Sequence, residues 1–412
     1  PSSILLAGDG VRDDTGRPLS SQRLRGGELA VLVRDVPAFG FRRLFFKGEF
    51  SEPGSGGPVP CRMESRSMSN EFIQLSLDKN GHIQELFSGD DRTSNWVNGT
   101  AGFDMAEFLY VEGRDPKSPL RTGPARISIG EKGPLVVSFI VESEAPGCRS
   151  MRTEYQLTAG LSRLDIFFTV DKKDVYDPEA VHIAWPFAVP DGKIRMDLAW
   201  GRFTPGEEQL PGANRNFFSV QRWIDISNAE RGITLATVDA PLFEVGALTA
   251  DPIFVGWLEK VEEGNTIFAY IMNNYWETNY KASQEGPVTF QFALQAHEGG
   301  FSGRDADLFG RERSRPLLLS SAETPGEPDL SLFSLSSPDI QVTSIKPAAD
   351  GGGWILRLYN PGERKESVFF KGKDGRPLKI HKSSLFEDKG AGISGPVTLD
   401  PLEFVTLVLE KQ

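Results

Sequence analysis

The segment Leu164-Asp165-Ile166-Phe167-Phe168-Thr169-Val170 is short and rich in aromatic and β-branched residues, which is typical of a β-strand. Similar apolar or alternating runs recur along the chain, separated by Gly, Pro, Asn and Asp. They include Leu29–Arg34, Phe72–Leu77, Leu135–Val141, Ile233–Val238, Ile267–Ile271, Val288–Leu294, Trp354–Tyr359 and Phe404–Leu409. Many short strands with Gly- and Pro-rich turns predict an all-β fold of sandwiches or barrels.

Two local signals refine this expectation. Asn80-Gly81 lies between two apolar runs and predicts a hairpin with a type I′ turn, because both residues tolerate positive φ. Ser302–Arg313 is the best candidate for a short helix.

Two stretches rich in Gly, Pro and Ser have the composition of linkers and divide the chain. Residues 51–68 and 311–329 are these predicted linkers. They separate a small β-sandwich piece at 1–50, a large β domain at 69–310 and a C-terminal small β-sandwich at 330–412. A β piece of about 50 residues is marginal alone, so we expect it to pair with the terminal domain or with upstream strands.

The composition of the 412 residues limits the function classes. The formal charge is -12 and no basic run is clustered, which argues against a nucleic-acid partner. No apolar run approaches the length of a membrane-spanning helix, so no membrane partner is predicted. Cys61 and Cys148 are expected to be free thiols. The low cysteine count and the lack of a leader favour the cytoplasm.

Sequence signatures of several chemistries are absent. The four histidines, which are spread along the chain, form no recognised metal-binding pattern, so no metal site is predicted. The chain has no GxSxG after a strand and no Gly-rich nucleotide motif. Paired carboxylates for glycoside hydrolysis are compatible with 57 acidic residues, but sequence spacing selects no pair. The histidines are His82, His182, His297 and His381.

The densest polar and aromatic cluster is Met272–Tyr280, which follows an apolar run. Aromatic faces bind the C–H surfaces of sugars, and amides bind pairs of hydroxyls. Either this cluster faces a carbohydrate, or it is a turn whose aromatic residues pack on the sheet. The candidate substrate-binding residues are Asn273, Asn274, Tyr275, Trp276, Thr278 and Asn279.

Two further segments have alternative interpretations. In Asn214–Asp225, Gln221, Trp223 and Asp225 share one strand face, which favours an ion-paired structural strand or a domain contact over a substrate site. His182 lies in an apolar run and is either a satisfied core residue or a general acid or base.

In their order and spacing, several segments resemble the post-catalytic region of family 38 glycoside hydrolases. Asp35–Phe41 looks like the family's DVPxxGY turn, and Asn70–Ile83 looks like the first hairpin of its large β domain. The remaining similar segments are Trp223–Leu242, Asn273–Tyr280 and Ile345–Asn360. The resemblance covers nearly the whole chain.

This resemblance implies a large supersandwich like that of galactose mutarotase, flanked by small β-sandwiches. It also implies a parent α-mannosidase that retains configuration, with a zinc ion and an aspartate nucleophile in an N-terminal α/β domain. No segment here matches that domain, so we expect it to be missing and transfer no catalytic or metal-binding residue. The implied partners are the protein's own N-terminal catalytic domain and a mannoside-type carbohydrate.

Three hypotheses follow. In the first, the chain is a non-catalytic part of a mannosidase that docks through an exposed apolar patch and completes the sugar site. Alternatively it is a mutarotase-like epimerase, which requires His182 to face a carboxylate in an open cleft. A stand-alone carbohydrate-binding module with Tyr275 and Trp276 as platforms is the third.

Overall fold

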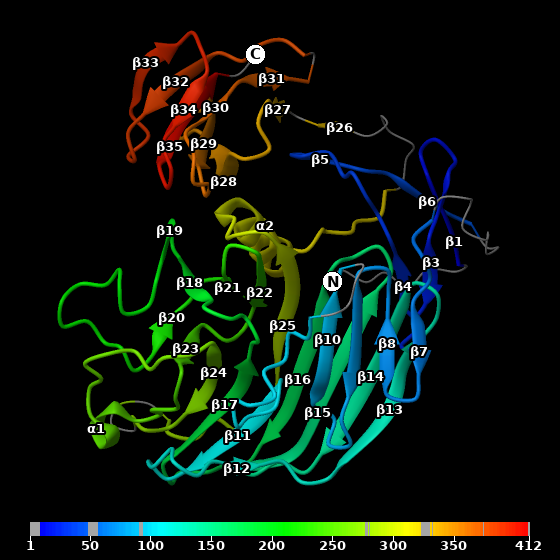
Figure 1. The fold of residues 1–412 in the computed structure, drawn as a ribbon. Helices are drawn as coiled ribbons and strands as arrows, with labels where there is room; N and C mark the ends of the chain where they lie inside the picture. The colour runs from blue at the N-terminus through cyan, green and yellow to red at the C-terminus, as the bar shows by residue number, and fades with distance from the viewer. Residues whose placement is uncertain are drawn as a thin grey trace.

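The computed structural model describes residues 9–47, 57–89, 94–276, 279, 281–322, 330–331, 333–373 and 375–410. The fold is all-β, which confirms the predicted class, with two short helices among its described elements (Figure 1). The helix predicted at Ser302–Arg313 is confirmed as α2 (Gly303–Ser314). Ser302 caps it by accepting a hydrogen bond from the Asp305 backbone N–H.

The largest sheet has nine antiparallel strands, and a six-stranded sheet faces it. The nine-stranded sheet has the order β13 (Ala125–Lys132), β14 (Val136–Ser143), β15 (Cys148–Thr158), β16 (Leu164–Lys172), β25 (Gly286–Glu298), β22 (Arg231–Thr237), β21 (Trp223–Ser227), β18 (Lys193–Leu198) and β19 (Gly201–Phe203). The six-stranded sheet has the order β12 (Leu120–Arg121), β11 (Glu107–Glu112), β17 (Glu179–Pro186), β24 (Thr266–Asn273), β23 (Leu242–Val245) and β20 (Phe218–Ser219).

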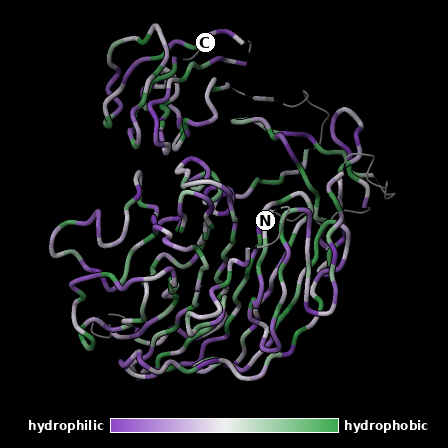
Figure 2. The backbone as a smooth tube through the Cα atoms, in the orientation of Figure 1, coloured by the Kyte–Doolittle hydropathy of each residue, from purple (hydrophilic) through white to green (hydrophobic). Residues whose placement is uncertain are grey.

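Aromatic side chains from both sheets form the centre of the core. Trp185 of the six-stranded sheet lies 5.2 Å from Phe292 and 6.3 Å from Phe168 of the nine-stranded sheet, measured between ring centroids. All three are fully buried. Apolar and polar residues alternate along many of the strands, as expected for strands with one buried face (Figure 2).

A four-stranded sheet packs its apolar side chains into the same core. Its order is β10 (Ile83–Ser88), β9 (Ile73–Leu77), β8 (Ser67–Ser69) and β7 (Arg62–Glu64). The strand β7 and the first two residues of β8 lie in the stretch 51–68 that was predicted to be a linker, so part of that stretch is sheet. Met68 explains this, because its apolar side chain is buried in the core.

The predicted β9–β10 hairpin is present, but its turn is not type I′. Asp78 accepts hydrogen bonds from the backbone N–H groups of Asn80 and His82, which extends the turn over residues 78–82. Gly81 has a positive φ of 85°, whereas Asn80 does not. The Asp78 side chain therefore selects a longer turn than the Asn-Gly pair alone predicts.

The N-terminal residues form small sheets beside the large sandwich. Gln22 anchors them, because its amide bonds the backbone N–H groups of Leu135 and Val136 and the Val136 carbonyl. In the first sheet, β1 (Gly10–Asp13) lies between β2 (Pro18–Leu19) and β6 (Leu44–Lys47). The second is the pair β3 (Ser21–Arg23) and β4 (Leu29–Val31). In the third, β5 (Gly40–Phe41) pairs with β26 (Leu330–Ser331). The β5–β26 pair joins the N-terminal piece to the chain that enters the terminal domain.

The terminal domain has its own core and lies above α2 and β19 (Figure 1). Arg202 donates to the Pro361 carbonyl and pairs with Glu363, and Trp200 packs edge-on against Tyr359. The five-stranded sheet of the terminal domain has the order β28 (Gln341–Pro347), β29 (Gly353–Tyr359), β35 (Phe404–Glu410), β32 (Ile380–Ser383) and β33 (Lys389–Ile393). Two further pairs of strands belong to this domain. The strand β27 (Phe333–Leu335) pairs with β31 (Phe370–Gly372), and β30 (Glu366–Val368) pairs with β34 (Val397–Leu399).

Candidate functional site

A buried network of polar side chains lies beneath the turn that precedes α1 (Pro252–Val255). Oε1 of Glu244 on β23 accepts hydrogen bonds from the backbone N–H groups of Thr249 (3.0 Å) and Ala250 (2.7 Å). Its Oε2 lies 2.9 Å from Nε2 of His182 on β17. The His182 ring stacks on Tyr270, whose hydroxyl donates to the Ala250 carbonyl. Because buried polar groups are costly unless they are bonded, this network fixes the turn.

The turn leads directly into α1. Ala250 adopts a left-handed conformation with φ of 47°, which a residue with a side chain rarely adopts. Asp251 then caps α1 by accepting a hydrogen bond from the Ile253 backbone N–H, and its carboxylate pairs with Arg114. The buried network and the cap together hold a strained turn in one place.

A buried asparagine holds the other end of α1. The Asn216 side chain donates to the Gly256 carbonyl (3.0 Å) and accepts from the Leu258 backbone N–H (3.2 Å). Asn216 belongs to the cluster 214–225, so that cluster contributes a support for α1.

The helix α1 presents apolar side chains to solvent. None of its residues is buried: Ile253 is 77% exposed, and Phe254 and Val255 are exposed beside it. Trp257, which follows the helix, is 67% exposed. A contiguous group of large exposed apolar residues is typical of a surface that docks another protein or binds a ligand. We call Ile253, Phe254, Val255 and Trp257 the α1 patch.

The predicted sugar-facing residues divide into supporting and exposed members. Asn274 is buried and is a support, since its side chain accepts from the Glu179 backbone N–H (2.6 Å) and donates to the carbonyls of Val175 and Asp177. Asn273 ends β24 and is exposed.

The next residues lead to the surface. The Tyr275 hydroxyl donates to the Gly113 carbonyl (3.0 Å), and burial raises its pKa, so the hydroxyl stays protonated. Trp276 is 53% exposed, and its indole N–H donates to Oδ1 of the exposed Asn279 (3.1 Å). Thr278 lies outside the described residues.

Arg114 connects this loop to α1. Its guanidinium lies 5.3 Å from the centre of the Tyr275 ring and also pairs with Asp251, the cap of α1. Figure 1 shows α1 beside the β23–β24 end of the six-stranded sheet. Arg114 therefore connects the loop after β24 to α1. Trp276 lies on this loop, next to Tyr275.

Sequence reasoning did not find the α1 patch. Asp251-Pro252 is typical of the start of a helix, and the residues that follow it are apolar. A helix with this sequence has no polar face to turn toward water. An apolar run of this length resembles a buried strand until the tertiary structure shows that nothing covers it.

Two other predictions are settled by burial. His182 faces Glu244, but both side chains are 0% exposed, so the open cleft required by the epimerase hypothesis is absent at His182. Within the cluster 214–225, the part that lies on β21 is an ion-paired structural strand: Asp225 accepts a hydrogen bond from Thr234 and lies 2.9 Å from His297. Cys61 and Cys148 are free, as predicted.

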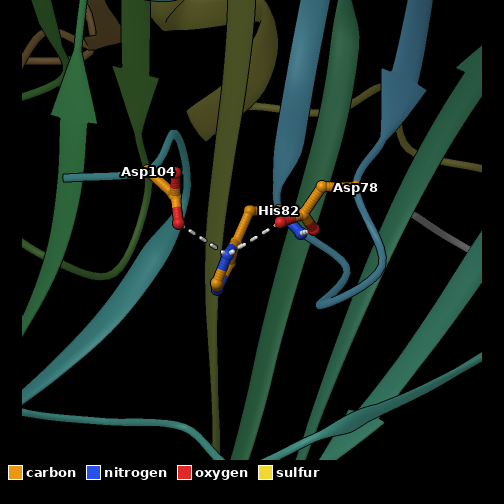
Figure 3. A group of neighbouring side chains, drawn as sticks. All are labelled: Asp78, His82 and Asp104. Atoms are coloured by element: carbon orange, nitrogen blue, oxygen red, sulfur yellow. Dashed lines mark hydrogen bonds and ion pairs between the residues drawn. The ribbon is translucent and has the colours of Figure 1, made fainter. Parts of the chain in front are cut away.

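One group within the described parts of the chain has ligand atoms close enough to share a metal ion. It comprises Asp78, His82 and Asp104, whose ligand atoms all lie within 4.8 Å of one another (Figure 3). No metal site was predicted from the sequence, because the four histidines form no recognised metal-binding pattern; Asp104 is distant from Asp78 and His82 along the chain.

Known proteins similar to this chain support the resemblance inferred from its motifs. Residues 339–407 match the family described as Glycosyl hydrolases family 38 C-terminal beta sandwich domain. A protein named putative mannosylglycerate hydrolase, from Halalkalibacterium halodurans, is 26% identical over 197 residues, which are 46% of this chain and 21% of that protein.

The fold matches two solved structures from Enterococcus faecalis. An α-mannosidase from strain V583 has a TM-score of 0.71 at 14% identity, covering 99% of this chain and 51% of that chain. A glycosyl hydrolase family 38 protein has a TM-score of 0.69 at 14% identity, covering 99% of this chain and 53% of that chain.

The chain thus shares its β architecture with the solved α-mannosidase. More specifically, its resemblance to the C-terminal β region of family 38 glycoside hydrolases is confirmed. The chain spans about half the length of the solved relatives and about a fifth of the curated one. In the described part of the chain, every helix is too short or too polar to cross a membrane.

Proposed function

We propose that this chain is the non-catalytic C-terminal part of a retaining, zinc-dependent α-mannosidase, which docks on a catalytic domain through the α1 patch. The exposed apolar residues Ile253, Phe254 and Trp257 carry this proposal. A stable protein gains nothing from holding such residues in water, whereas an interface buries them. The buried network around Glu244 supports the proposal, since it holds the patch in one position before any partner binds.

The resemblance assigns the zinc ion and the aspartate nucleophile to a separate α/β domain, so this chain would bind and orient. Trp276 offers an aromatic face, and Asn273 and Asn279 offer amides, which are the groups that recognise sugar C–H surfaces and hydroxyl pairs. In the proposal these three residues, with Thr278, complete the sugar site. Asn274 and Tyr275 hold the loop in place.

The first test uses the native gene product. Its intact mass, its zinc content and its hydrolysis of a chromogenic α-mannoside are measured together. A product about twice the size of this chain, with zinc and turnover, supports the proposal. A product of this size without zinc or turnover contradicts it.

The second test targets the α1 patch in that full product. Phe254→Ser with Trp257→Ser should loosen the contact between the two parts, and limited proteolysis should separate them. If the chain is produced apart from the catalytic part, the double variant should bind it at least about 30-fold more weakly, because even one interface hot spot contributes about 2 kcal/mol. Phe386→Ser is the matched control, since Phe386 is also exposed but lies in the terminal domain.

A carbohydrate-binding module is the second candidate, and the exposed Trp276 face favours it. The two candidates differ in what the isolated chain does. A module binds a mannoside without any other domain and loses that binding in Trp276→Ala. In the mannosidase proposal, the same substitution raises KM of the full product, and the isolated chain binds the sugar weakly or not at all.

A further inference from the structure

The turn of the β9–β10 hairpin holds a histidine between two carboxylates (Figure 3). Nδ1 of His82 lies 3.2 Å from Oδ2 of Asp104 and 3.8 Å from Oδ2 of Asp78. The His82 side chain is only 12% exposed, and Nδ1 is shielded from water without a hydrogen bond of good geometry. A buried ring nitrogen that faces two oxygens without bonding either one is unusual, because buried polar atoms are normally satisfied.

The other carboxylate oxygen of Asp78 is already occupied. Oδ1 of Asp78 accepts the backbone N–H groups of Asn80 and His82, which leaves Oδ2 to face the imidazole. Among the described residues, no lysine or arginine pairs with Asp78 or Asp104, and His82 is the side chain that faces both carboxylates. The group therefore has two carboxylates and one imidazole, with no fixed positive charge to balance them.

The backbone fixes how these side chains meet. Ile83 and Met105 form an isolated antiparallel bridge, with the Ile83 N–H donating to the Met105 carbonyl (3.2 Å). His82 and Asp104 immediately precede the two bridge residues. The Asp104 backbone N–H is in turn held by the buried Glu107 carboxylate (3.0 Å). The bridge and the Glu107 contact thus hold the backbone of His82 and Asp104 close together, and the Asp78 Oδ1 bonds hold Asp78 beside them.

We propose that Asp78, His82 and Asp104 bind one divalent transition-metal ion, with zinc or manganese as the matching ions. Imidazole and carboxylate ligands suit these ions, which bind N and O atoms at about 2.0–2.2 Å. Two ligands at that distance from one ion lie about 3 Å or more apart, as Nδ1 and the carboxylate oxygens do here. The ion clamps the hairpin of the four-stranded sheet onto the segment that leads into β11. This site is separate from the zinc that the proposed function assigns to another domain.

The test uses the isolated chain, stripped with EDTA and dialysed against Zn²⁺ or Mn²⁺ in separate arms at pH 7.5. Bound metal is counted by mass spectrometry, and the melting temperature is measured with and without the ion. We expect saturation at one ion per chain for at least one metal and a higher melting temperature in its presence, because an ion that binds only the folded state stabilises it.

Two variants and one control decide the outcome. Asp104→Ala removes an exposed ligand with little risk to the fold, and His82→Gln removes the nitrogen. Each should weaken binding at least about tenfold, since losing even a supporting partner of a metal ligand costs 10–100-fold. His381→Gln removes a histidine that pairs with Glu410 in the terminal domain, and binding should stay unchanged. Absence of saturable binding for both ions, or wild-type binding by both ligand variants, would show that the group is an ion pair only.

Discussion

The layer beneath α1 and the surface above it use residues in opposite ways. Below, Glu244 and His182 are fully buried, and Glu244 holds the backbone of a strained turn. Above, Ile253 and Trp257 are large, apolar and exposed. Polar groups are inside and apolar groups are outside, the reverse of the usual arrangement.

The comparison indicates which residues stabilise the fold and which are available for binding. The buried Glu244 carboxylate accepts hydrogen bonds from two backbone N–H groups of the turn, so it specifies the shape of that turn. The exposed apolar atoms contribute nothing to the stability of the isolated chain. Substitutions should therefore separate stability from binding cleanly, with the largest stability losses below and the smallest above.

The largest expected effect is at Glu244. Glu244→Ala leaves the Thr249 and Ala250 N–H groups and His182 buried without their partner. We expect a loss of about 3–5 kcal/mol in the free energy of unfolding, as for other broken buried pairs. Urea unfolding followed by tryptophan fluorescence measures it. Glu259→Gln, at an exposed position nearby, is the control and should change stability by less than about 0.5 kcal/mol.

A smaller loss is expected at Asn274, which ties the loop after β24 to residues 175–179. Asn274→Ala removes the partner of the Glu179 N–H and of two carbonyls. The cost should be about 1–3 kcal/mol, the usual penalty for a buried polar group left unbonded. Unchanged urea stability in this variant would mean that the loop is not held by Asn274.

A second buried carboxylate, Asp197, tests the comparison at a position where the charge is poorly compensated. Burial, together with the neighbouring Asp307, raises the pKa of Asp197 from 3.8 to about 8. The folded state therefore keeps a proton that the unfolded state has released between these two values, so stability falls as pH rises from about 4 to about 8. Asp197→Asn should remove this component. The difference in urea midpoint between the variant and the wild type should grow in favour of the variant between pH 5 and pH 8.

The smallest expected stability change is at Trp276, which stands on the loop that Asn274 supports. Trp276→Ala should alter the free energy of unfolding by less than about 0.5 kcal/mol, because the side chain is half exposed and lies outside the core. The same variant should raise KM of the full product toward a mannoside. A large stability loss in this variant would show that Trp276 is a packing residue. Asn274 would then not differ from Trp276 as a supporting residue differs from a surface residue.

The fold was largely predictable because its signals are local. Leu164–Val170 lies within β16, Val288–Leu294 lies within β25, and the helix predicted at Ser302–Arg313 is α2. The turn at Asn80-Gly81 was predicted with the wrong type, because the Asp78 side chain adds hydrogen bonds that a two-residue signal does not contain.

The candidate site was predicted only in part. The cluster 273–279 was located by its composition, but sequence could not separate the buried Asn274 from the exposed Trp276, which are two residues apart on one loop. The α1 patch was not predicted, because the sequence of an apolar run does not indicate whether another layer of the protein covers it.

The sequence by itself determined that this protein is built from short strands, where most of them run, and which family of β regions it resembles. These properties depend on periodicity and turn residues, which act over a few positions. Only the tertiary structure decided that His182 is sealed beneath Tyr270, that Arg114 joins Tyr275 to Asp251, and that Asp104 meets His82. Each of these depends on sheet order and strand register, which bring residues distant in the chain within a few ångströms and leave others uncovered.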